Sequence, residues 1–231
     1  MKTRVSLKLG VGLLALSIAL CRMSFLHADG MPGIKAKDAR FQEAYAFFET
    51  AYPADQAKRE KITTLISRLG DNRLVQDGDV KVRAAAVVTR LLLQEGPCVI
   101  APLIEATTNV DTAVRLNALR ALRMALVKPG TRGAFHDYAW RVLPVLGSLA
   151  VDEMADVRLL AVIYIGQIGE SLGSGNPREE CVRYLRNALK DKAESVAVQA
   201  SRSLILLGRG DLVPAELQRK VTGPHGEMEI E

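Results

Sequence analysis

The stretch that decides the fold reads DTAVRLNA (residues 111–118), and it predicts the start of an amphipathic helix. An aspartate is typical of a helix N-terminus, where it accepts hydrogen bonds from free backbone N–H groups and lies favourably in the helix dipole. Val114, Ala118 and Leu122 follow at four-residue intervals, which predicts one apolar stripe. The small alanine lets a neighbouring helix approach this stripe closely.

Three other segments repeat the pattern. They read DVKVRAAA (79–86), MADVRLLA (154–161) and AESVAVQA (193–200), and the aligned valines are 32, 43 and 39 residues apart. An apolar segment with helical periodicity precedes each one. These first helices are expected at 58–69, 99–107, 138–149 and 178–189. The chain is therefore predicted to be all-α, built from four helix pairs.

The element PLIEA (102–106) followed by DTAVRLNA resembles a HEAT repeat, and the resemblance covers about residues 58–208. It implies an α-solenoid, in which stacked helix pairs share one core. Armadillo and other α-solenoids stay open as alternatives. A tetratricopeptide array fits less well, because its period is constant at about 34 residues. In HEAT proteins aspartate and arginine often form a ladder between repeats, which the resemblance assigns here to Asp79, Arg83, Asp111, Arg115 and Arg158.

Both flanks of the repeat region have their own character. Residues 29–57 are expected to form an N-terminal capping region, because four aromatic residues lie at helical spacing within 38–52. Such a helix would cover an open solenoid end. Residues 209–231 are expected to hold a short helix at 214–221 and then a flexible tail rich in Gly and Pro.

Residues 1–28 predict a secretory signal peptide. Basic residues precede an uncharged apolar run at 9–20, and this run is shorter than the roughly 20 residues of a membrane span. Cleavage is expected before Asp29, which would leave a secreted or periplasmic protein with no stable membrane span. The alternatives are an uncleaved membrane anchor and a lipoprotein modified at Cys21, the latter disfavoured by the bulky Leu20.

The basic character of the chain belongs mainly to this segment. The whole chain has 31 Lys and Arg against 26 Asp and Glu, for a net charge of +5. Residues 1–28 hold four of the basic residues and none of the acidic ones, so the remainder is close to +1. Nucleic acid is therefore not expected as a partner.

No arrangement in the sequence predicts catalysis, a cofactor or a metal centre. The three histidines are spread over the signal, a loop and the tail, whereas a zinc site needs three or four converging ligands. The glycine-rich stretch at 166–175 follows a predicted helix and lacks a Gly-Lys-Ser/Thr sequence, so it is not a phosphate loop. Cys98 and Cys181 lie two repeats apart and are expected to be free, mostly buried thiols.

The predicted function is a non-catalytic scaffold or adaptor that binds a protein or peptide, because solenoids usually bind along an extended face. Positions three and six after each aligned valine should point away from the packed stripe. Leu160 and Ile163 are unusually apolar at these positions, and Arg120 and Arg202 flank them. These four residues are the candidate partner site. The alternative is that the C-terminal segment or tight curvature covers the two apolar residues.

Two rival functions stay open. One is an enzyme-associated module that resembles the HEAT-like repeats of phycobilin lyases. The other is a structural component of the cell envelope, held by the N-terminal segment.

Overall fold

The computed structural model describes residues 39–77, 80–128 and 135–222, so the predicted signal (1–28) and the end of the predicted tail lie outside the described residues. In this part the chain is mainly helical, with ten α-helices, which confirms the all-α prediction. None of the described helices is long and apolar enough to cross a membrane. All described residues belong to one compact unit, 36–231.

The elements follow one another in a regular order. The α-helices are α2 (Ala39–Ala51), α3 (Gln56–Ile66), α4 (Ala84–Gln94), α5 (Ile100–Ala106), α6 (Thr112–Leu126), α7 (Leu143–Leu149), α8 (Ala155–Ser171), α9 (Asn176–Ala188), α10 (Glu194–Leu206) and α11 (Ala215–Thr222). Three short 3-10 helices are η1 (Pro97–Val99), η2 (Ala139–Val142) and η3 (Gly210–Leu212), and two strands are β1 (Leu74–Asp77) and β2 (Val80–Arg83).

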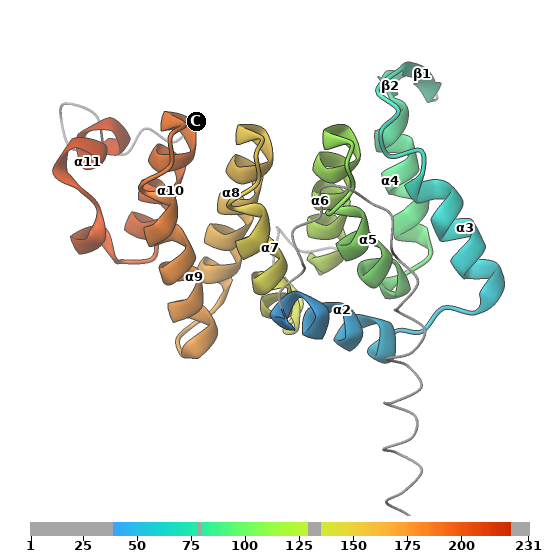
Figure 1. Cartoon of the computed structure of the whole chain (residues 1–231), viewed down its shortest axis with the longest axis horizontal. Helices are drawn as coiled ribbons and strands as arrows, with labels where there is room; N and C mark the ends of the chain where they lie inside the picture. The colour runs from blue at the N-terminus through green and yellow to red at the C-terminus, as the bar shows by residue number, and fades with distance from the viewer. Residues whose placement is uncertain (1–38, 78–79, 129–134, 223–231) are drawn as a thin grey trace, which may run out of the picture. The chain divides into compact units, whose positions relative to one another are not determined.

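Consecutive helices pack in pairs: α3 with α4, α5 with α6, α7 with α8, and α9 with α10. The second helices of the pairs also pack on one another in chain order, so that α4, α6, α8 and α10 form one layer (Figure 1). The last described helix, α11, packs on α10. Each turn within a pair therefore lies next to the turn of the following pair.

Helix α6 forms as its sequence predicts. The Asp111 carboxylate accepts a hydrogen bond from the backbone N–H of Ala113 at 2.8 Å, which satisfies a donor that the helix itself leaves free. Val114, Ala118 and Leu122 are all buried. The stripe is thus the face that packs against the first-helix layer and the neighbouring second helices.

The predicted first helices are present, and in one of them a proline lies at the helix start. In the third pair, Pro144 lies in the first turn of α7, directly after η2. Its missing N–H costs nothing there, because the first N–H groups of a helix have no intrahelical partner. The first helix of this pair is therefore a 3-10 turn followed by a short α-helix.

In the first pair, one prediction is wrong. Residues 79–86 were expected to begin a helix, but β1 and β2 form an antiparallel hairpin in this place, with Leu74 opposite Arg83. Alternating β-branched residues favour a strand here. Arg90 of α4 fixes the hairpin through two hydrogen bonds to the Asp77 carboxylate, at 2.7 and 3.0 Å.

The hairpin also moves the helical register. Helix α4 begins at Ala84 and buries Ala84, Val88 and Leu92. The predicted alignment on Val82 is therefore two residues too early, and it would have placed the exposed Arg90 on the core face.

The third and fourth pairs approach each other closely at a glycine. A β-carbon added to Gly166 of α8 would lie 2.8 Å from the β-carbon of Ser203 on α10. Real β-carbons do not come this close, so the contact between α8 and α10 requires glycine at this position. The apparent glycine-rich loop at 166–175 thus begins inside a helix-packing interface.

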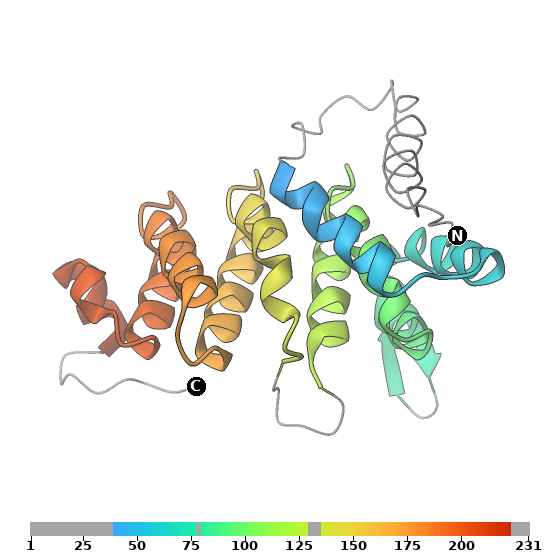
Figure 2. The same ribbon diagram turned by 90° about the horizontal axis from the view of Figure 1, so that it is seen from below.

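Helix α2 does not cover an end of the layer, contrary to the predicted capping role. It lies across α5 and α7, as both views show (Figure 1, Figure 2). Phe48 of α2 is fully buried and contacts Tyr138 beside η2, with ring centroids 5.8 Å apart. Helices α5 and α7 have only seven residues each, so they leave apolar surface that the aromatic residues of α2 cover.

Candidate functional site

The turns inside three of the helix pairs share one arrangement. Asn109, Asp152 and Asp191 each accept a hydrogen bond from the backbone N–H two residues later, at 2.8–2.9 Å. This is the Asx turn, which asparagine and aspartate favour because their side chains are short. Each turn leads directly into the second helix of its pair.

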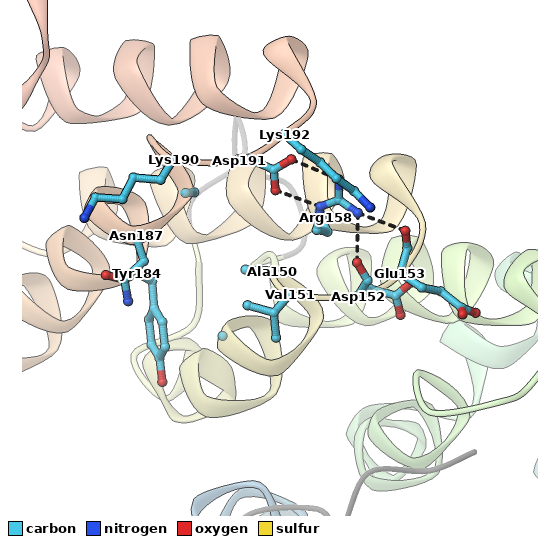
Figure 3. Close-up of a pocket in the computed structure, with 12 residues that line it drawn as sticks. Ala150, Val151, Asp152, Glu153, Arg158, Tyr184, Asn187, Lys190, Asp191 and Lys192 are labelled. Atoms are coloured by element: carbon cyan, nitrogen blue, oxygen red, sulfur yellow. Dashed lines mark hydrogen bonds and ion pairs between the residues drawn. The ribbon is translucent and has the colours of Figure 1, made fainter. Parts of the chain in front are cut away.

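Two arginines tie each turn to the next one. Arg115 donates to both carbonyls of its own turn, at 2.9 and 3.0 Å, and to Asp152 of the following turn at 3.1 Å. Arg158 repeats this geometry one pair later. It donates to the carbonyls of Asp152 and Glu153, at 2.9 and 3.0 Å, and to both carboxylate oxygens of Asp191, at 2.7 and 2.9 Å (Figure 3).

The link between Arg158 and Asp191 is almost fully buried, with side-chain exposures of 5% and 8%. The hydrogen bonds from Arg158 lower the pKa of Asp191, and those to Asp191 raise the pKa of Arg158. Both groups therefore stay charged at neutral pH. Because each charge compensates the other in a desolvated place, losing one partner would be costly.

Only some of the predicted ladder residues link neighbouring pairs. Arg115 and Arg158 do link neighbouring pairs. Asp111 instead caps its own helix. Arg83 is exposed at the start of α4, and no ion pair between described residues includes it. Asp79 lies outside the described residues. The acceptors of the two arginines are aspartates that precede the helix, because only the turn reaches the neighbouring pair.

A groove of about 660 Å³ opens beside this link, between the α7–α8 turn and the α9–α10 turn (Figure 3). Its floor is apolar, and Val151 at its edge is 71% exposed. Charged residues of both signs form the rim. The lining residues are Gly147, Ala150, Val151, Asp152, Glu153, Arg158, Tyr184, Asn187, Ala188, Lys190, Asp191 and Lys192.

Tyr184 forms one wall of the groove because residue 147 is a glycine. A β-carbon on Gly147 of α7 would lie 2.8 Å from the Tyr184 hydroxyl oxygen and closer still to two ring carbons. The ring therefore lies directly on the α7 backbone. Burial and the nearby Glu180 raise the pKa of Tyr184, so its hydroxyl is a neutral donor at physiological pH.

Similarity to known proteins gives no separate guide to this groove. No family model, no curated protein and no solved structure matches the chain. The choice of the groove as the candidate site therefore depends on its geometry and its charges.

A second, smaller groove of about 410 Å³ continues from the first along α9 towards η3. The two grooves share Asn187 and Lys190. Arg186 also lines the second groove, and Leu212 of η3 closes it. The two grooves therefore meet near the C-terminal end of α9, and together they are referred to as the channel.

The four predicted partner residues lie elsewhere, on the second-helix layer. Arg120 of α6 is exposed and donates to Asn117 at 2.9 Å. Leu160 and Ile163 of α8 are half-buried, not exposed as predicted, because α8 packs against α6, α7, α9 and α10. Arg202 of α10 is also half-buried, and its Nε has no hydrogen-bond partner.

The six large hydrophobic side chains that are exposed among the described residues are others: Leu74, Val110, Met124, Val151, Met154 and Leu206. Val110, Val151 and Met154 lie at or beside the turns of the second and third pairs. Exposed apolar surface often marks an interaction site. The exposed apolar surface therefore lies at the turn edge, and Leu160 and Ile163 of α8 do not provide it.

The described residues include three further kinds of chemically active group: metal-binding side chains, two thiols and one imidazole. No group of three His, Cys, Asp or Glu side chains among them is arranged to hold a metal ion. Cys98 and Cys181 are free, as predicted, with Cys98 half-buried and Cys181 buried. His136 stacks on Tyr138 with ring centroids 4.8 Å apart, so its loop packs against the aromatic cluster of α2.

The groove residues were missed because they are spread over two helix pairs. A signal was nevertheless present in the sequence. Asn109, Asp152 and Asp191 each lie five residues before an aligned valine, so the Asx turns are periodic. A glycine in the short helix α7, Gly147, was the second signal, since it marks a close approach by another element.

Proposed function

We propose that the chain is a HEAT-like α-solenoid of four repeats that works as a non-catalytic scaffold or adaptor, binding a partner protein through the groove between its third and fourth repeats. Two features support the solenoid. Each second helix packs on the next one in chain order, and Arg115 and Arg158 form equivalent links between successive turns.

One observation carries the binding role: the groove is held open by buried structure on both sides. The Arg158–Asp191 link fixes the two turns, and the contact of Tyr184 with Gly147 fixes the helices below them. A preformed site loses little entropy when it binds, which raises its affinity. An apolar floor with a few polar groups around it is the usual composition of a binding site.

Selection from a phage-displayed peptide library against the purified protein tests this proposal. Peptides that bind should lose affinity on Val151→Glu, since the bound peptide would bury the new carboxylate against the apolar floor. Because Val151 is 71% exposed, this change should not unfold the protein. Leu74→Glu is the matched control, because Leu74 is 66% exposed in the hairpin, outside the groove. Selected peptides that ignore Val151→Glu would contradict the proposal.

The proposed location is outside the cytoplasm, supported by the basic and apolar pattern of residues 1–28. Mass spectrometry of the protein purified from its native host tests this. An N-terminus at Asp29 supports export by signal cleavage. An unmodified chain that still begins at Met1 in the cytoplasmic fraction contradicts it.

A further inference from the structure

Three basic residues in and just after α9 have no ion-pair partner among the described residues, whereas the acidic residues of the grooves do. Arg186, Lys190 and Lys192 are exposed, and no ion pair between described residues includes them. The acidic residues that line the two grooves are already engaged. Arginines bind all four of them: Asp152, Glu153, Glu179 and Asp191. The charge that remains uncompensated along this channel is therefore positive.

The channel has the length and spacing of an extended peptide. Helix α9 has 13 residues and is therefore about 20 Å long, which an extended chain of about six residues matches. Arg186 lies in the last turn of α9, and Lys190 and Lys192 follow two residues apart in the turn after the helix. Alternate side chains of an extended chain lie about 6.6 Å apart on one face, so charges at every second position can meet successive basic residues at this end of α9.

We infer that this channel binds an acidic, extended segment of a partner protein, with carboxylates at alternate positions facing Arg186, Lys190 and Lys192. The backbone of the segment crosses the larger groove and covers the apolar floor beside Val151. This inference depends on the proposed binding function and adds the chemistry of the partner. A protein segment fits better than a nucleic acid, because its alternate neutral side chains can cover the apolar floor of the larger groove, which a continuous row of phosphates cannot.

Fluorescence anisotropy with a labelled heptapeptide tests the inference. The probe alternates glutamate with valine or serine, and a second probe has glutamine in place of each glutamate. The double variant Arg186→Gln, Lys190→Gln should bind the acidic probe about tenfold more weakly, since two ion contacts together contribute about 1.4 kcal/mol. The glutamine probe should be weaker by a similar factor on the unchanged protein. Added salt should weaken the acidic probe alone.

The matched control is Lys58→Gln, Arg68→Gln, which removes the same charge from exposed residues in and just after α3. It should leave binding within twofold of the unchanged protein. Thermal unfolding of both double variants checks that they fold. Equal binding of the two probes, or equal loss in both double variants, would overturn the inference.

The chain's own sequence EMEIE (227–231) has the same alternation of acidic residues. A variant that ends at Thr222 separates this source from a partner. Similar binding by the full chain and the shortened chain supports a partner as the occupant. If the acidic probe binds only to the shortened chain, the segment 227–231 of the chain itself occupies the channel, and the inference of a partner is overturned. If neutral peptides bind and Val151→Glu abolishes their binding, the adaptor function stands and only the acidic preference fails.

Discussion

Removing the carboxylate of Asp191 should destabilise the protein strongly. This carboxylate accepts two hydrogen bonds from Arg158, at 2.7 and 2.9 Å, and one from the backbone N–H of Ala193, at 2.8 Å. In Asp191→Ala the Arg158 guanidinium keeps only its two carbonyl acceptors in the preceding turn. Its side chain is 5% exposed, so water compensates the lost partner only in part.

The size of the effect follows from this burial. Breaking a buried ion pair by removing one partner costs about 3–5 kcal/mol, because an uncompensated charge remains. Asp191→Asn keeps the Asx turn and should cost less, about 1–2 kcal/mol. In the double variant Arg158→Met, Asp191→Ala, no buried charge remains. It should therefore recover at least half of the stability that Asp191→Ala loses.

Equilibrium unfolding in urea, monitored by circular dichroism, measures these differences, provided that the dependence on urea concentration stays constant among the variants. Asp211→Ala is the control, because the Asp211 side chain is 67% exposed and lies 3.6 Å from Arg209. It should change the free energy of unfolding by less than about 0.5 kcal/mol. A loss below about 1 kcal/mol for Asp191→Ala would refute the structural role of the link.

Three further predictions follow from the packing and the titrating groups. Gly166→Ala should destabilise the protein by about 1–3 kcal/mol through its clash with Ser203, and Ser203→Gly in the same chain should restore part of this loss in urea unfolding. Arg158 lowers the pKa of Asp191 in the folded chain, so the unfolded chain binds more protons in acid. This contribution to stability is complete above the unfolded pKa of about 4 and is lost as pH falls through the lower folded pKa. Unfolding free energies measured at falling pH should therefore drop more steeply for the unchanged protein than for Asp191→Asn. Burial raises the pKa of Cys181 to about 12, so iodoacetamide should label Cys98 before Cys181 in the native protein, as peptide mapping would show.

The helix pairs could be predicted because their apolar stripes are local. Val114, Ala118 and Leu122 lie within nine residues, and the same spacing decides both the helix and its buried face. The hairpin could not be separated from a helix start in this way. DVKVR has the acidic residue, the valine and the arginine of the helical pattern, yet its alternating valines also suit a strand. The strand is decided by the pairing of residues 80–83 with residues 74–77, which lie outside the repeated pattern.

The position of α2 also depends on information that the repeat pattern lacks. Its aromatic stripe predicts a helix that covers apolar surface, and it does so. Which surface it covers depends on the shortness of α5 and α7. The sequence does not predict this shortness, because residues 97–99 and 139–142 continue the helical pattern but form 3-10 turns. Helix α2 therefore covers the side of the helix pairs and does not cap their end as predicted.

The candidate site was harder to predict than the fold. The resemblance pointed correctly to Arg115 and Arg158, but their acceptors belong to the next turn and not to the helix start. The groove itself exists only where two pairs meet. Its apolar floor combines small residues of one pair with Tyr184 of another, and no single helix pair contains both.

Hydrogen–deuterium exchange with and without the acidic heptapeptide distinguishes the groove from the surface that the sequence predicted. Binding in the groove predicts slower amide exchange at 147–153 and 183–192, with the outer side of the second-helix layer unchanged. Slower exchange confined to the helical turns around Arg120, Ile163 and Arg202, with none at the two groove segments, would contradict the groove as the binding site.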